Sequence, residues 1–168
     1  MPQTVTNETI GTITYEPADP ECSWETTLLF AAREVVLNVW FDGATMTPTR
    51  LAAVSRFPAQ LPFFDTTARA AMHDDWPASD STVRDYLAHH VDDLDDEACS
   101  AALGTSDPSS LDAASFIARL HLVRIGLYPD APAHNAVFDY TTGRELTDNL
   151  IAVKFGTSGA LTEIAMES

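Results

Sequence analysis

In the first part of the chain, apolar residues alternate with polar ones, which is the pattern of β-strands. Enrichment in β-branched and aromatic residues predicts three strands, at residues 12–16, 24–30 and 35–41. Prolines and an Asp-Gly pair punctuate these segments, so we expect them to form an antiparallel meander. In the third strand, Val35, Leu37, Val39 and Phe41 are apolar and lie on the same face. We therefore expect helices to cover this face.

Between about residue 47 and residue 114, the apolar residues recur at steps of three and four, which predicts a helical insert. Thr47-Pro48 is a typical helix start, with an N-cap hydroxyl and a proline at the first helical position. The same spacing predicts a second helix that ends near Trp76 and a third helix over residues 83–94. A short fourth helix is expected to begin among the acids that follow and to end at Gly104.

The C-terminal part returns to strand patterning, with strands expected at residues 116–127, 136–140, 150–155 and 161–166. Strands at both ends of a chain, with helices between them, are typical of the α+β class with an antiparallel sheet. We therefore predict a single domain over residues 1–168. Its sheet is built from about three N-terminal and about four C-terminal strands, and the helical insert packs on one face.

The charge balance restricts the possible ligands. The chain has a formal net charge of −16 at pH 7, with 25 acidic residues against nine basic ones, and Lys154 is the single lysine. Nucleic acids are bound by lysines and arginines that neutralise phosphates, so we expect no nucleic-acid ligand. Two interpretations of the acidity stay open: a solvated surface that keeps the protein in solution, or a surface that attracts a basic protein partner.

The acids concentrate in the helical insert, where nine of them lie between Asp74 and Glu97 against the single basic residue Arg84. Such a negative field attracts a basic protein and raises its association rate. Trp76 is a candidate aromatic anchor if it is exposed. The alternative is a solvated acidic face without a partner. The candidate partner-binding residues are Asp74, Asp75, Asp85, Asp92, Asp93, Asp95, Asp96 and Glu97.

Histidines beside acids in the insert support an alternative hypothesis, a metal-dependent enzyme or metal-binding protein. The candidate ligands are His73, His89 and His90, because imidazole and carboxylate groups can converge on one ion. His89 and His90 are adjacent and would point about 100° apart on a helix, which disfavours joint ligation. His90 also belongs to the apolar stripe of its helix, so we interpret it as a hydrogen-bonded core histidine.

The sequence contains no phosphate-binding loop, no dinucleotide-binding glycine motif and no nucleophile elbow. We therefore predict no catalytic residues and no cofactor, and favour a non-enzymatic role. Cys22 and Cys99 are too few for a disulfide framework or a thiolate metal site. No apolar run reaches the roughly 18 residues of a membrane span, and the first residues lack the pattern of a secretory signal. We expect a cytoplasmic protein, and its oligomeric state stays open.

Three segments near the C-terminus resemble a known family: RIGLYP at residues 124–129, FDYTTGRELTD at 138–148 and IAMES at 164–168. With weaker likeness around Trp24, at residues 40–42 and over residues 86–90, the chain is similar over most of its length to the bacterial family catalogued as domain of unknown function number two thousand and four. The resemblance implies a small cytoplasmic bacterial protein without an established activity, so it supplies no catalytic residues. By analogy with small proteins of toxin and immunity gene neighbourhoods, we expect an immunity or antitoxin-type protein that binds a basic toxin.

Overall fold

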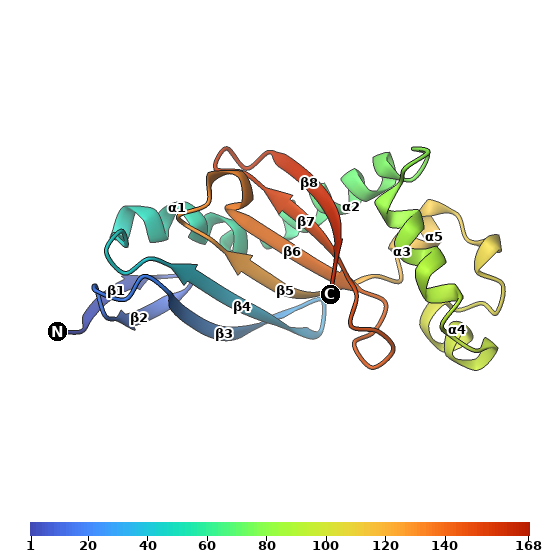
Figure 1. Ribbon diagram of the computed structural model, residues 1–168, viewed down its shortest axis with the longest axis horizontal. Coiled ribbons are helices and arrows are strands. Elements are labelled where there is room, and N and C mark those ends of the chain that lie inside the picture. Colours follow the sequence, from blue (N-terminus) through green and yellow to red (C-terminus); the bar gives the residue numbers. More distant parts are fainter.

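The computed structural model describes residues 1–168 and has the α+β class expected from the sequence (Figure 1). Its strands are β1 (Gln3–Asn7), β2 (Gly11–Tyr15), β3 (Cys22–Phe30), β4 (Arg33–Phe41), β5 (His121–Leu127), β6 (Ala136–Thr141), β7 (Leu150–Phe155) and β8 (Leu161–Glu167). Its α-helices are α1 (Pro48–Ala59), α2 (Leu61–Asp75), α3 (Thr82–Val91), α4 (Asp96–Leu103) and α5 (Ala113–Ile117). Two single 3₁₀ turns, η1 (Pro108–Ser110) and η2 (Pro132–His134), lie in the loops.

Strands β3 to β8 form a six-stranded sheet in chain order. Four of its five neighbouring pairs are antiparallel, but β4 and β5 are parallel, with Val36 opposite Arg124 and Val39 opposite Leu127. The prediction of an antiparallel sheet is therefore wrong at this pair, and the sheet is mixed. The reason is the helical insert itself, which serves as the long crossover that a parallel pair of strands requires.

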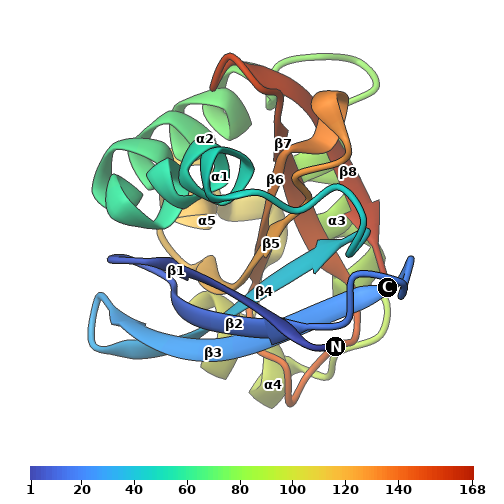
Figure 2. The same cartoon turned by 90° about the vertical axis from the view of Figure 1, so that its left-hand side faces the viewer.

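The N-terminal meander is also corrected. β2 does not join β3 but pairs with β1, a strand that the sequence pattern had not indicated, in a separate two-stranded sheet. In Figure 2 this small sheet crosses in front of β4 and below α1. Val5 and Ile13 enter the common core, and the Asn7 side-chain amide donates a hydrogen bond of 3.1 Å to the Ser55 hydroxyl on α1.

Helices α1 and α2 cover one face of the six-stranded sheet (Figures 1 and 2), as predicted for the insert. Phe57 and Phe64 pack against Phe138 and Phe155 of the sheet, with ring centroids 5.3–6.3 Å apart, inside one cluster of 34 buried apolar residues. The prediction that the whole insert packs on this face does not hold for α3, α4 and α5. These three helices gather beyond one end of the sheet (Figure 1). This arrangement leaves large parts of α3 and α4 open to solvent.

The helix boundaries follow local capping chemistry. Thr47 accepts a hydrogen bond from the Arg50 amide at 3.2 Å and so begins α1, as predicted, and Gly104 ends α4 in a left-handed conformation. The predicted strand at residues 116–127 is wrong in its first part. The Asp112 carboxylate accepts from the Ser115 amide at 2.8 Å and begins α5, so β5 starts only at His121.

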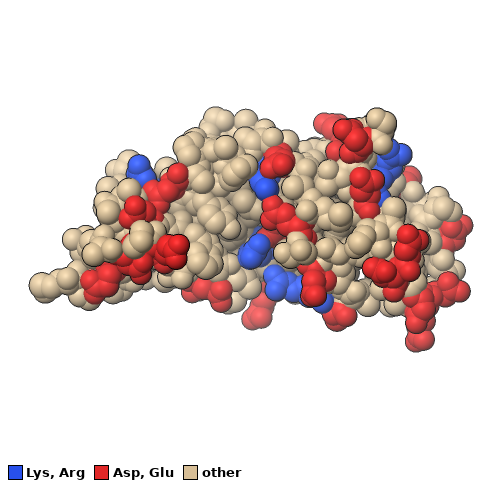
Figure 3. Space-filling model, viewed as in Figure 1, with Lys and Arg blue, Asp and Glu red and all other residues tan.

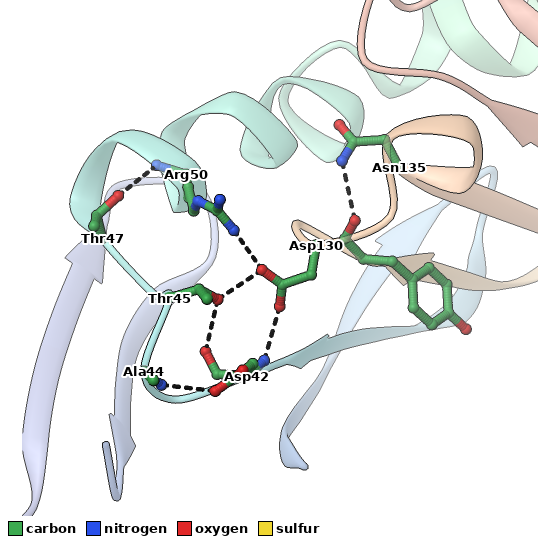
Figure 4. Close-up of polar contacts among 8 residues, drawn as sticks. Asp42, Ala44, Thr45, Thr47, Arg50, Asp130 and Asn135 are labelled. Atoms are coloured by element: carbon green, nitrogen blue, oxygen red, sulfur yellow. Dashed lines mark hydrogen bonds and ion pairs between the residues drawn. The ribbon is translucent and has the colours of Figure 1, made fainter. Parts of the chain in front are cut away.

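One loop carboxylate joins both sides of the crossover (Figure 4). Asp130, in the loop after β5, accepts hydrogen bonds from the Asp42 amide at 2.8 Å and from the Thr45 hydroxyl at 2.6 Å. It also forms an ion pair with Arg50 in the first turn of α1. The loop after β5 is thereby fastened to the segment that leads from β4 into the helical insert.

Candidate partner-binding site

The structure divides the eight acidic candidates into two groups. Asp75 and Asp95 accept hydrogen bonds from backbone amides and have local structural roles. The other six are exposed, and none takes part in an ion pair within the chain. We define the acidic helical surface by these six residues: Asp74, Asp85, Asp92, Asp93, Asp96 and Glu97.

Asp75 connects the end of α2 to the beginning of α3. Its Oδ2 accepts hydrogen bonds from the Ser81 hydroxyl at 2.7 Å and from the Val83 amide at 3.0 Å. Ser81 in turn caps α3 by accepting from the Arg84 amide at 3.1 Å. Asp95 caps α4 in the same way, by accepting from the Ala98 amide at 2.8 Å. These two carboxylates satisfy amides that would otherwise have no partner at the helix N-termini.

A groove of about 360 Å³ lies between α3 and the segment around η1. Most of its walls are apolar: they come from Trp76 after α2, from positions of α3 that share one face, and from the η1 segment. Asp92 and Arg84 supply charge at the groove. Trp76 also packs against the Phe116 ring, with centroids 5.8 Å apart, so it is both part of the core and a wall of the groove. The apolar lining residues are Trp76, Leu87, Ala88, Val91, Pro108 and Leu111.

Acidic side chains gather around this end of the molecule. Figure 3 shows the carboxylates clustered over the end where α3 and α4 lie in Figure 1, with few basic atoms among them. Arg84 is the single lysine or arginine between Asp74 and Glu97, and its guanidinium already donates a hydrogen bond to the Ala78 carbonyl oxygen. An apolar groove at an end of the molecule that carries many exposed carboxylates is the arrangement that a cationic, partly apolar surface of another protein would complement.

The three candidate metal ligands do not lie in one cluster. His73 and His89 are exposed, whereas His90 is 4% exposed and packs edge-on against the Tyr86 ring, with centroids 4.2 Å apart. The His90 Nε2 lies 3.4 Å from the Thr147 hydroxyl, and burial lowers the pKa of this imidazole. The interpretation of His90 as a core histidine is confirmed. No group of three or more His, Cys, Asp or Glu residues is placed to hold a metal ion.

Sequence reasoning identified the acids and Trp76 but missed the groove. Leu87 and Val91 belong to the apolar stripe of α3, and that stripe was assigned to the core as a whole. In the structure the stripe is wider than the core requires, so its edge, which includes the exposed Ala88, faces the groove. The width of this apolar stripe was therefore the signal in the sequence that could have indicated the groove. Leu111 carried none, because it lies outside the regular elements.

Comparisons with protein-family models, with curated proteins and with solved structures find no match to this chain. The family resemblance noted from the sequence stays a prediction. None of the helices is both long enough and apolar enough to cross a lipid bilayer.

Proposed function

We propose that this protein is a non-enzymatic binding domain whose acidic helical surface and adjoining groove bind a basic protein partner. The observation that carries the proposal is the combination of six exposed carboxylates without ion pairs and an apolar groove that is lined by α3 and by one of these carboxylates, Asp92. Either feature alone has a simpler explanation. Acids alone serve solubility, and a shallow apolar groove alone is a packing defect.

Electrostatics supports a basic partner. An uncompensated negative surface increases the rate of encounter with a cationic protein by roughly 10- to 10³-fold at low salt. The groove then provides the apolar contact area that exposed charge pairs do not, because pairs at the border of an interface contribute little free energy. Trp76 is suited to anchor the partner, since its ring is already held in place by Phe116.

The specific role that we propose is that of an immunity or antitoxin-type protein. A toxin that acts on nucleic acid presents a cationic surface to the phosphates of its substrate, and the acidic helical surface would occupy that surface in place of phosphate. We further propose a cytoplasmic location. Cys22 and Cys99 are both buried and free, as expected for a protein that folds in a reducing compartment.

Two pairs of matched variants test the proposal. The triple variant Asp92→Asn, Asp93→Asn, Glu97→Gln removes three charges of the acidic helical surface. Its control removes three exposed charges elsewhere that have no side-chain hydrogen bond or ion pair, through Glu8→Gln, Glu21→Gln and Asp148→Asn. The exposed groove residue is changed in Ala88→Gln, and its control is Ala70→Gln on the exposed side of α2. The net charges match within each pair.

Each variant is immobilised and exposed to lysate of the source organism at about 50 mM and about 300 mM NaCl, and the retained proteins are quantified by mass spectrometry. We expect a basic protein that is retained by the wild type and by both controls. It should be lost from the triple variant and from Ala88→Gln, and its retention should fall at higher salt. If the basic protein is lost equally from the triple variant and from its control, retention depends only on the total charge, and the proposal is contradicted.

A further inference from the structure

Three arginines of this acidic protein have no partner within the chain and converge on one cavity. Of the eight arginines, five donate to carboxylates or backbone carbonyl oxygens: Arg50, Arg56, Arg69, Arg84 and Arg124. The remaining three, Arg33, Arg119 and Arg144, make no side-chain hydrogen bond or ion pair, and all three line the same cavity of about 710 Å³. In a chain of net charge −16, such a concentration of free cations requires an explanation.

The cavity lies where distant segments of the chain meet. Arg33 stands at the first position of β4, Arg119 and His121 at the entry into β5, and Arg144 in the loop after β6. One wall is formed by α4. Two carboxylates, Glu34 and Glu145, also line the cavity, and neither forms an ion pair with the arginines. The cavity therefore presents separate cationic and anionic groups rather than closed ion pairs.

The position of Arg119 depends on a glycine. Gly104 ends α4 with a φ of +72°, and a Cβ atom on it would lie 2.1 Å from a guanidinium nitrogen of Arg119. The guanidinium thus rests directly on the backbone at the C-terminus of α4, where the partial negative charge of the helix favours a cation. This contact uses none of the hydrogen-bond donors of the exposed Arg119 side chain, which lies beside the cavity.

The position of Arg33 follows a strained turn. The two residues between β3 and β4 are Ala31 and Ala32, with φ values of +50° and +60°. For residues with a Cβ atom this left-handed conformation costs about 1–2 kcal/mol each, and hairpins normally place Asn or Gly there. Strain of this kind concentrates at functional sites. Here it makes the turn as tight as possible and sets Arg33 at the edge of the cavity.

His121 reports the local potential. Burial lowers the pKa of this imidazole, and the positive charges of Arg33, Arg69 and Arg119 lower it further, while Glu145 acts in the opposite direction. The surroundings of His121 are therefore cationic although the protein as a whole is strongly anionic. A neutral imidazole can still donate one hydrogen bond and accept another.

We propose that the cavity lined by Arg33, Arg119, Arg144 and His121 binds a small phosphorylated metabolite, namely a phosphate monoester that also carries hydroxyl groups. Guanidinium groups match phosphate oxygens through paired N–H donors. Glu34 and Glu145 line the same cavity and can accept hydrogen bonds from the alcohol hydroxyl groups of an ester, which inorganic phosphate lacks. The volume falls in the range of small-molecule sites, about 300–1,000 Å³. A long polyanion is disfavoured by the many carboxylates on the rest of the surface.

The test is an NMR titration of the whole protein with four phosphate monoesters: a hexose 6-phosphate, a pentose 5-phosphate, glycerol 3-phosphate and a nucleoside 5′-monophosphate. Inorganic phosphate and the unphosphorylated hexose serve as comparison ligands. We expect at least one ester to give saturable shifts at residues 33–34, 119–123 and 141–146. Its affinity should exceed that of inorganic phosphate at least tenfold, and it should raise the pKa of His121, because bound phosphate supplies negative charge.

Arg33→Gln and Arg144→Gln should each weaken the binding of that ester at least about tenfold, which corresponds to one lost charged hydrogen-bond pair. Arg50→Gln, on α1 away from the cavity, should leave the affinity unchanged. The proposal is overturned if no ester gives saturable shifts up to about 10 mM, a limit that corresponds to very weak binding. It is also overturned if inorganic phosphate binds as tightly as every ester, or if Arg50→Gln weakens binding as much as Arg33→Gln.

Discussion

Asp74 and Asp75 are neighbours in sequence, and the structure gives them opposite roles. Asp75 joins α2 to α3 through two accepted hydrogen bonds, whereas Asp74 is exposed and makes none. In Asp75→Ala, the Val83 amide loses its acceptor in a residue that is 0% exposed, so water does not readily replace it. An unsatisfied buried donor costs about 1–3 kcal/mol, and the lost Ser81 bond adds about 1 kcal/mol.

We therefore expect Asp75→Ala to lower the free energy of unfolding by about 2–4 kcal/mol. For a chain of this length, that loss corresponds to a decrease in Tm of about 4–16 °C. Asp74→Ala is the matched control and should change the free energy by less than about 0.5 kcal/mol. Urea denaturation followed by circular dichroism measures both variants. If the two variants lose equal stability, the assignment of Asp75 to a structural role and of Asp74 to the acidic helical surface is wrong.

Three further changes test other parts of the structure in the same unfolding assay. Tyr140→Phe removes the hydroxyl that donates to Asp65 at 2.8 Å and should lower the free energy of unfolding by about 1 kcal/mol. Replacement of Ala31-Ala32 by Asn-Gly should raise it by about 1 kcal/mol, because the left-handed strain is relieved, and an unchanged or lower value would contradict the strain. For His90, burial lowers the pKa from the usual 6.5, so the unfolded chain binds the proton first and stability should fall as the pH drops below about 6.5. In His90→Gln this fall should be shallower, and an identical pH profile would argue against a buried neutral imidazole.

Features that depend on neighbouring residues could be predicted from the sequence. The cap at Thr47, the start of the fourth helix among its acids and the stop at Gly104 are decided within about one helical turn, and all three predictions are confirmed. The segment from Phe116 to Leu120 was misassigned, because a short apolar run fits either a strand or a buried helix. The decisive residue was Asp112, whose capping bond begins α5.

Features that depend on distant residues could not be predicted in this way. The alternation of apolar residues in β4 and β5 is the same for parallel and antiparallel pairing, so the pattern did not reveal their parallel register. The arginine cavity poses the same difficulty, because Arg33, Arg119 and Arg144 are far apart in the chain. Their convergence follows from the crossover that places β5 beside β4. Only the wall of the apolar groove that comes from α3 has a signal in the sequence, namely the apolar stripe of that helix. The other wall comes from a loop and has none.

The measurement that tests the central claim most directly is the retention of a basic protein by the triple variant Asp92→Asn, Asp93→Asn, Glu97→Gln against its charge-matched control. The account predicts that the wild type and the control retain the same basic protein at about 50 mM salt and that the triple variant does not. Retention by the triple variant at the level of the control would contradict a binding role for the acidic helical surface. The acids would then serve only to keep the protein in solution.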